Sequence, residues 1–318
     1  MATEIILRQL LIFAILIVIG VLAYWRKIVT AEMKNSLARI VIDVTLPFLI
    51  FSTFTNMEYE PKLIRNALLI FVLAFVNLFV LYSVGKLSAR ILGLKGSQEI
   101  VHSLHTMLGN IVFLAFPLLD ALFPNGLGVF YGAVYQLASN FVTFTFGVYK
   151  LSAGTQKSGW KSLINVNTIA LALGAIVMLV GFSLPSVVRV SFESLGKCTS
   201  PLSMVYIGAM LASMNIRRAI LQKSIYILSF NKLLFVPLIL AFVYRFGLSL
   251  MGIDIAKEAF FVIMLQAAMP SQTIVVVLAH RYNSDHELAG ANLFVTTLFS
   301  IATLPIVYFL LEWIWVII

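Results

Sequence analysis

The sequence contains ten apolar windows, each long enough to cross the hydrocarbon core of a membrane, which takes roughly 20 residues of helix. Lipid offers backbone groups no hydrogen-bond partner, so such windows must fold as helices that bond internally. We therefore expect an all-α integral membrane protein. The ten predicted spans are residues 5–25, 37–55, 64–84, 99–122, 127–149, 165–184, 188–213, 224–245, 256–281 and 286–317.

Composition supports this class. Of the residues, 61% are hydrophobic and 11% are charged, whereas about 25% of residues in a soluble domain carry a charge. No small-residue cleavage site follows the first apolar window, so we expect it to be a retained span and not a signal peptide. The lipid bilayer is accordingly the first expected partner.

Positive charges are distributed unevenly among the loops. Those after spans 1, 3, 5, 7 and 9 hold fourteen lysines and arginines, against five in the other loops. Cytoplasmic loops carry such an excess, so both termini are expected on the non-cytoplasmic side of the cytoplasmic membrane. The net charge of +9 then reflects topology and does not indicate nucleic acid. The fourteen are Arg26, Lys27, Lys34, Arg39, Lys86, Arg90, Lys95, Lys150, Lys157, Lys161, Arg217, Arg218, Lys223 and Arg281.

An internal repeat relates the two halves of the chain. Three pairs of glycines or prolines recur at nearly one spacing, and five spans per half force the second half to enter the membrane inverted. Inverted repeats with discontinuous helices are typical of secondary transporters. We predict two repeats, 1–150 and 165–318, joined by a short cytoplasmic linker, 151–164. The pairs are Gly20 with Gly181, Pro47 with Pro201, and Gly109 with Pro270, at offsets of 161, 154 and 161.

The fourth and ninth predicted spans each contain a helix breaker followed by polar residues. Pro270 precedes Ser271 and Gln272, and Gly109 precedes Asn110. If these discontinuous helices cross, their half-helix N-termini place partial positive charge at one point near the midplane, which suits an anion. Uncharged polar side chains add hydrogen bonds without burying a charge. The sequence thus predicts an anion site here, although ordinary kinks with locally satisfied polar groups would give the same pattern.

Further polar and kinking positions complete the candidate site. Gln136 and Asn140 lie one turn apart in span 5, where helix–helix hydrogen bonding is an equally good explanation. Asp43 and Lys232 are ionisable residues within spans and are candidates for coupling or for holding a charge, with snorkelling of the lysine as the alternative. Ser52 of span 2 is added as a candidate substrate contact. Helix breaks are expected at Pro47, Pro117, Pro201 and Pro270.

No motif indicates an enzyme, a metal site or a cofactor. Membrane-embedded catalysis needs a paired acid and base or a set of metal ligands, and neither pattern occurs. Glu99, His102 and His105 have ligand-like spacing, but no further acidic or histidine pair complements them. We therefore expect no catalytic residues, no metal and no cofactor.

Four segments resemble one known family, the auxin efflux carrier family of the bile/arsenite/riboflavin transporter superfamily. They are TLPFLIF (45–51), GNIVFLAFPLLDALF (109–123), QAAMPSQTIVVVLAHRYNSDHELA (266–289) and LINVNTIALALGAIVMLVGFSLP (163–185). The last departs from the family pattern, with Asn167–Thr168 in place of Asn-Pro. Plant members have Pro-Asn where this chain has Gly109–Asn110, and they carry a long cytoplasmic loop that is absent here.

The resemblance implies ten spans in a 5+5 inverted repeat, with crossed discontinuous helices 4 and 9 beside a substrate anion, and a homodimer. The departures make auxin a poor candidate, and bacterial-sized relatives are associated with malate or malonate. We expect alternating-access transport of a small carboxylate, by coupling to a proton or sodium or by uniport. The alternatives are a cation/proton exchanger of similar architecture, which normally places carboxylates beside its broken helices, and a sensor that binds the ligand without moving it.

Overall fold

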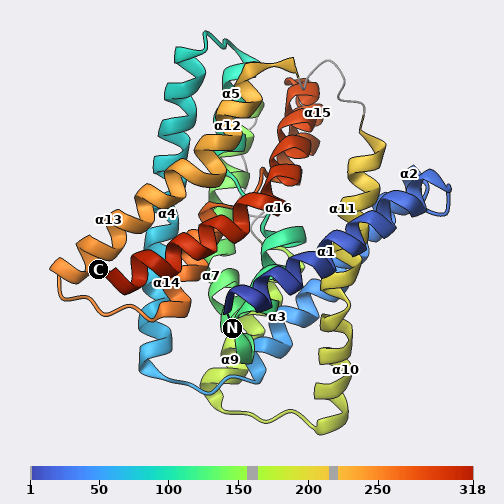
Figure 1. Cartoon of the computed structure of the whole chain (residues 1–318). Helices are drawn as coiled ribbons and strands as arrows, with labels where there is room; N and C mark the ends of the chain where they lie inside the picture. Colours follow the sequence, from blue (N-terminus) through green and yellow to red (C-terminus); the bar gives the residue numbers. More distant parts are fainter. Residues whose placement is uncertain (1, 156–163, 215–220, 318) are drawn as a thin grey trace. The chain divides into compact units, whose positions relative to one another are not determined.

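The computed structural model describes residues 2–155, 164–214 and 221–317 (Figure 1). Over these residues the chain is helical and contains no strand. Four positive charges of the predicted cytoplasmic loops, and most of the predicted linker 151–164, lie outside the described residues. These charges are Lys157, Lys161, Arg217 and Arg218.

The chain divides into two compact units. Unit 1 comprises Met1–Leu68, Val112–Val134 and Ile164–Met214, and unit 2 comprises Leu69–Ile111, Tyr135–Leu163 and Asn215–Ile318. Each unit thus takes segments from both halves of the sequence. Sequence similarity defines the predicted repeats 1–150 and 165–318, whereas contacts define these units, so the repeats stay a prediction.

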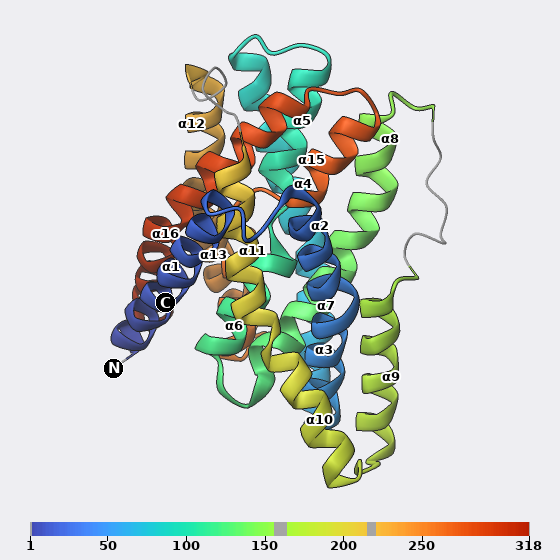
Figure 2. The ribbon, with the colours of Figure 1, turned by 90° about the vertical axis from the view of Figure 1, so that its right-hand side faces the viewer.

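Unit 1 is built around α3, with α9 and α10 packed along it (Figure 2). The Asn165 side chain caps the start of α9 by accepting hydrogen bonds from the amides of Asn167 and Thr168. Gly181, in the left-handed conformation at φ 68°, ends this helix. The helices are α1 (Ala2–Trp25), α2 (Ala31–Ile40), η1 (Val41–Thr45), α3 (Leu46–Thr55), α6 (Phe116–Leu122), η3 (Pro124–Gly126), α9 (Val166–Val180), α10 (Ser186–Lys197) and α11 (Thr199–Ser213).

Unit 2 contains a helix, α14, that is buried on every side from Ala259 to Ala267. Its helices are α5 (Ser97–Met107), η4 (Thr143–Gly147), α8 (Val148–Leu151), α12 (Lys223–Phe230), η7 (Asn231–Phe235), α13 (Val236–Leu250), α14 (Lys257–Ala267), α15 (Thr273–Arg281) and α16 (His286–Ile317). Three further helices contain the boundaries between the units. They are α4 (Pro61–Ile91), η2 (Ile111–Ala115) and α7 (Leu127–Val142).

Three prolines follow a π-helical segment by two residues: Pro47 after η1, Pro117 after η2 and Pro237 after η7. A proline lacks the backbone donor and clashes with the carbonyl four residues earlier, and the wider π turn relieves both constraints. The prediction of helix breaks is therefore wrong for Pro47 and Pro117, because helices Ala31–Thr55 and Ile111–Leu122 run through them. Pro201 lies in the first turn of α11, directly after the turn that separates it from α10.

Four helical stretches in the described part of the chain are long and apolar enough to cross a membrane: Ala31–Thr55, Pro61–Ile91, Lys223–Leu250 and His286–Ile317. Three apolar helices are shorter: Leu11–Trp25, Ile111–Leu122 and Val166–Val180. Windows 99–122, 188–213 and 256–281 are each divided by an interruption, so neither half reaches membrane length. The count of ten spans therefore stays a prediction.

Two glycines allow the backbones of α1 and α11 to touch. A Cβ at Gly20 would meet the Val205 carbonyl oxygen, and a Cβ at Gly208 would meet that of Ile17. Small residues at such positions permit the close helix approach on which packing in lipid depends.

Gly208→Ala is expected to destabilise the protein by about 1–3 kcal/mol, because the added methyl group forces two backbones apart. The matched control is Gly247→Ala in α13, where a Cβ meets nothing within 4 Å. That change should be neutral or stabilising, by up to about 1 kcal/mol, because alanine favours the helix. Thermal unfolding in detergent measures both. Equal unfolding temperatures for the two variants would contradict close packing at Gly208.

Candidate functional site

Two interrupted helical segments meet in unit 2. In one, α5 ends at Met107 and helical structure resumes at Ile111. In the other, α14 ends at Ala267 and α15 begins at Thr273. The two interruptions pair through an isolated antiparallel bridge between Gly109 and Ser271.

Backbone hydrogen bonds fix this pairing. The Asn110 amide donates to the Pro270 carbonyl at 2.7 Å, and the Gln272 amide donates to the Leu108 carbonyl at 3.1 Å. Gly109 permits the approach, since even a Cβ at this position would lie 3.1 Å from both the Gln266 carbonyl oxygen and the Met269 Cβ. A side chain larger than alanine would therefore push the segments apart.

The interruptions satisfy most of their own backbone groups. We expected the break to leave amides free for an anion, and this is wrong for Asn110, Ser271 and Gln272. The Ser271 amide donates to Thr296 Oγ1 at 3.0 Å, and the other two amides form the bridge bonds. Backbone groups that are buried away from water and left without a hydrogen bond are costly. Two interruptions side by side avoid this cost because the backbone groups of one hydrogen-bond with those of the other.

Free donors remain one residue further along, at the start of α15. The amides of Thr273 and Ile274 form no hydrogen bond with another described residue, as expected for the first turn of a helix. Thr273 Oγ1 is buried and also has no partner in the described part of the chain. These groups carry the partial positive charge of the helix N-terminus.

The polar side chains of the interruption are held in defined orientations. Ser271 is fully buried, and its hydroxyl donates to the His105 carbonyl at 3.2 Å. Gln272 Oε1 lies 3.3 Å from Thr143 Oγ1, whose hydroxyl also donates to the Ser139 carbonyl at 2.7 Å, and the Gln272 side chain carries both donors and an acceptor. Asn110 is 2% exposed. The interruption thus holds side chains that carry both donors and acceptors.

Lys232 binds the end of α5 and is fully buried. Its Nζ donates to the Thr106 carbonyl at 3.0 Å, in the last turn of α5 and just before the interruption. A cation at a helix C-terminus is stabilised by the carbonyls that have no partner in the helix. Among the described residues Lys232 forms no ion pair.

The remaining predicted residues lie elsewhere. Gln136 is buried and Asn140 is partly buried in α7, and no contact places either at the bridge. Asp43 is exposed in η1 of unit 1. The Ser52 hydroxyl, also in unit 1, donates to the carbonyl of Leu49.

Sequence reasoning missed three threonines. Thr143 Oγ1 lies 3.3 Å from Gln272 Oε1, Thr296 accepts from the Ser271 amide, and Thr273 is the first residue of α15. One of them could have been found from the sequence. Thr143 follows Gln136 and Asn140 at helical spacing i, i+4 and i+7, so it lies on the same helix face. In the part of the chain that the structure describes, no group of three or more histidine, cysteine or acidic side chains is arranged to hold a metal ion.

Comparison with known proteins identifies the family. A family described as "Membrane transport protein" matches residues 5–158 and 151–308. An uncharacterized transporter of Methanocaldococcus jannaschii is 26% identical over 93% of this chain and 96% of its own length. One of Methanothermobacter thermautotrophicus is 25% identical, over 92% and 94% of the two chains.

A bacterial relative extends the same pattern. The uncharacterized transporter YfdV of Escherichia coli K12 is 23% identical over 92% of this chain and 94% of its own length. With several apolar helices and a family match across nearly the whole chain, this is a multi-pass membrane protein. It belongs to the membrane transport protein family of auxin efflux carriers.

Proposed function

We propose that this protein is a secondary transporter or facilitator that moves a small organic anion across the cytoplasmic membrane. The substrate is a carboxylate such as malate, malonate or a related acid. The observation that carries the proposal is the bridge between the Gly109 and Ser271 interruptions, which places donors and a helix N-terminus beside one another.

The local chemistry favours an anion. A carboxylate at the interruption accepts from the amides of Thr273 and Ile274, with Asn110 and Gln272 contributing side-chain amides. Hydrogen bonds to a charged group contribute roughly 1.5–3 kcal/mol each. The Lys232 ammonium at the end of α5 adds positive potential to the same region.

The absence of acidic residues argues against the cation/proton exchanger. No aspartate or glutamate occurs between Glu99 and Asp120 or between Glu258 and Asp285, the two stretches that contain the interruptions. An exchanger normally places carboxylates beside its broken helices to bind the cation. An enzyme is likewise disfavoured, since the family consists of transport proteins.

The proposal includes the architecture. Ten spans in a 5+5 inverted repeat, with discontinuous helices 4 and 9 crossing at their interruptions, give a site that can open to either side in turn. Both termini lie outside the cytoplasm and the protein is a homodimer. Coupling to a proton or sodium and uniport both fit this arrangement.

A ligand screen on purified protein tests the proposal. A ligand present at 100 times its Kd stabilises the folded state by about 2.7 kcal/mol, so malonate or malate should raise the unfolding temperature. Uptake of the same acid into proteoliposomes then separates a transporter from a sensor. If no small carboxylate shifts the unfolding temperature, the proposed substrate class is wrong. Binding without uptake would instead indicate a sensor that binds the ligand without moving it.

A further inference from the structure

One face of α5 carries a row of titratable side chains that leads from its beginning to the interruption. Glu99, His102 and His105 are spaced three residues apart, so they follow one another along the helix at about 4.5 Å of rise per step. The row ends three residues before Leu108, where the interruption begins. Its outer end is partly exposed and its inner end is buried.

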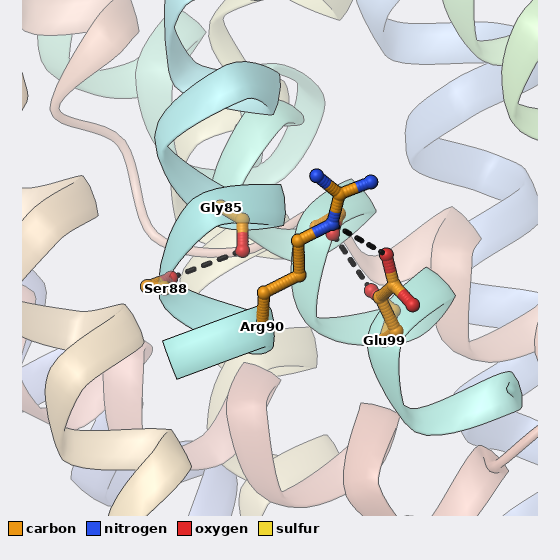
Figure 3. Close-up of polar contacts among 5 residues, drawn as sticks. Gly85, Ser88, Arg90 and Glu99 are labelled. Carbon is orange, nitrogen blue, oxygen red and sulfur yellow. Dashed lines mark hydrogen bonds and ion pairs between the residues drawn. The ribbon is translucent and has the colours of Figure 1, made fainter. Parts of the chain in front are cut away.

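Contacts with α4 define the outer end of the row. Arg90 Nε lies 4.0 Å from Glu99 Oε1, and the two side chains face each other in Figure 3. The Glu99 side chain is 31% exposed. One turn further in, His102 is fully buried, and its Nε2 shares a hydrogen bond of 2.9 Å with Ser88 Oγ.

The inner imidazoles are only partly hydrogen-bonded. His102 Nδ1 has no hydrogen-bond partner among the described residues, and the only group facing a ring nitrogen of His105 there is the backbone of Gln272, at the interruption; both side chains are 0% exposed. A neutral imidazole has one N–H donor and one acceptor nitrogen. A buried polar group without a partner costs about 1–3 kcal/mol. Such groups call for an explanation, and a transient water or proton supplies one.

Few charged groups face this row. Lys232 of η7 is the charged neighbour of His105, and its ammonium binds the next residue, Thr106. From α4, Arg90 and Tyr82 act on Glu99. The α15 and α16 segments contribute the uncharged Ser271 and Thr296 at its inner end. Lys150 of α8 instead lies over the ring of Phe146.

We propose that Glu99, His102 and His105 form a proton path that couples substrate movement to proton movement. This inference rests on the proposed function. A proton taken up by one ring nitrogen of His102 is matched by release of a proton from the other toward His105, directly or through one water molecule. His102 ends as the opposite tautomer and resets when the ring turns over.

The last transfer delivers the proton to the substrate. A proton that reaches His105 faces the ammonium of Lys232 and is repelled from it, so it passes on to the carboxylate at the interruption. The carboxylate becomes a carboxylic acid, His105 returns to the neutral form, and the substrate crosses with one negative charge fewer.

The four histidines of this chain provide a matched experiment, since His102 and His105 are buried whereas His280 and His286 are exposed. In proteoliposomes, a pH gradient should drive malonate uptake with proton movement reported by a pH-sensitive dye. His102→Gln and His105→Gln should each reduce gradient-driven uptake about tenfold or more, while malonate/malonate exchange and binding persist. His280→Gln and His286→Gln should match the parent.

The outcomes separate the two proposals. If the parent takes up malonate without moving protons, or if both buried-histidine variants keep gradient-driven uptake, the proton path is wrong and the transporter stands. Failure to bind any carboxylate would instead reject the proposed function.

Discussion

Asn110→Ala is expected to weaken carboxylate binding by about 10- to 100-fold. A hydrogen bond to a charged group contributes roughly 1.5–3 kcal/mol, and 1.4 kcal/mol corresponds to a factor of ten. The substitution keeps the backbone amide, and therefore the bond to the Pro270 carbonyl. It removes only the side-chain amide from the site. Thermal shift or calorimetric titration with malonate measures the change in Kd.

Asn77→Ala is the matched control. Asn77 is also a fully buried asparagine of unit 2, where it donates to the Ile263 carbonyl and accepts from the Tyr244 hydroxyl at 2.8 Å. Its loss should lower stability and leave the Kd of malonate unchanged. If Asn110→Ala binds every carboxylate tested as tightly as the parent, the substrate does not lie at the interruption.

The positions of the interruptions could be predicted because they depend on local chemistry. Proline lacks a donor wherever it occurs, so Pro270 marked a break in window 256–281. Gly109, a residue that also disfavours a helix interior, marked the corresponding break in window 99–122, and the repeat offset relates the two positions. The same reasoning wrongly predicted helix breaks at Pro47 and Pro117, because a π turn accommodates a proline without ending the helix. Sequence alone does not say which response the chain adopts.

The atoms that pair across the interruption could not be predicted, because the choice of partner depends on tertiary geometry. Lys232 was recognised as an ionisable residue within a span, yet its acceptor, the Thr106 carbonyl, lies 126 residues away in the sequence. The amides of Asn110, Ser271 and Gln272 looked available to an anion, and they pair within the protein. The free donors instead begin at Thr273, which became evident only from the register of the bridge.

Pro270→Ala is expected to impair transport more than binding. Proline in a helix interior costs about 3 kcal/mol relative to alanine, so the substitution can shift the balance toward a continuous α14–α15 helix by about 100-fold. In that helix the amides of Ser271 and Gln272 bond within the helix, and their contacts with Thr296 and Leu108 are lost. The α14–α15 segment, about which the transporter must rearrange, becomes stiffer.

Pro305→Ala provides the control, since Pro305 lies inside α16 and its replacement also restores a backbone donor, but away from the interruption. Malonate uptake into proteoliposomes and malonate affinity are measured for both variants and the parent. Pro270→Ala should lose more uptake than its change in Kd explains, whereas Pro305→Ala should retain both. An uninterrupted helix cannot present the Thr273 and Ile274 amides to a substrate. Normal uptake by Pro270→Ala would therefore mean that transport does not need the interruption at Pro270.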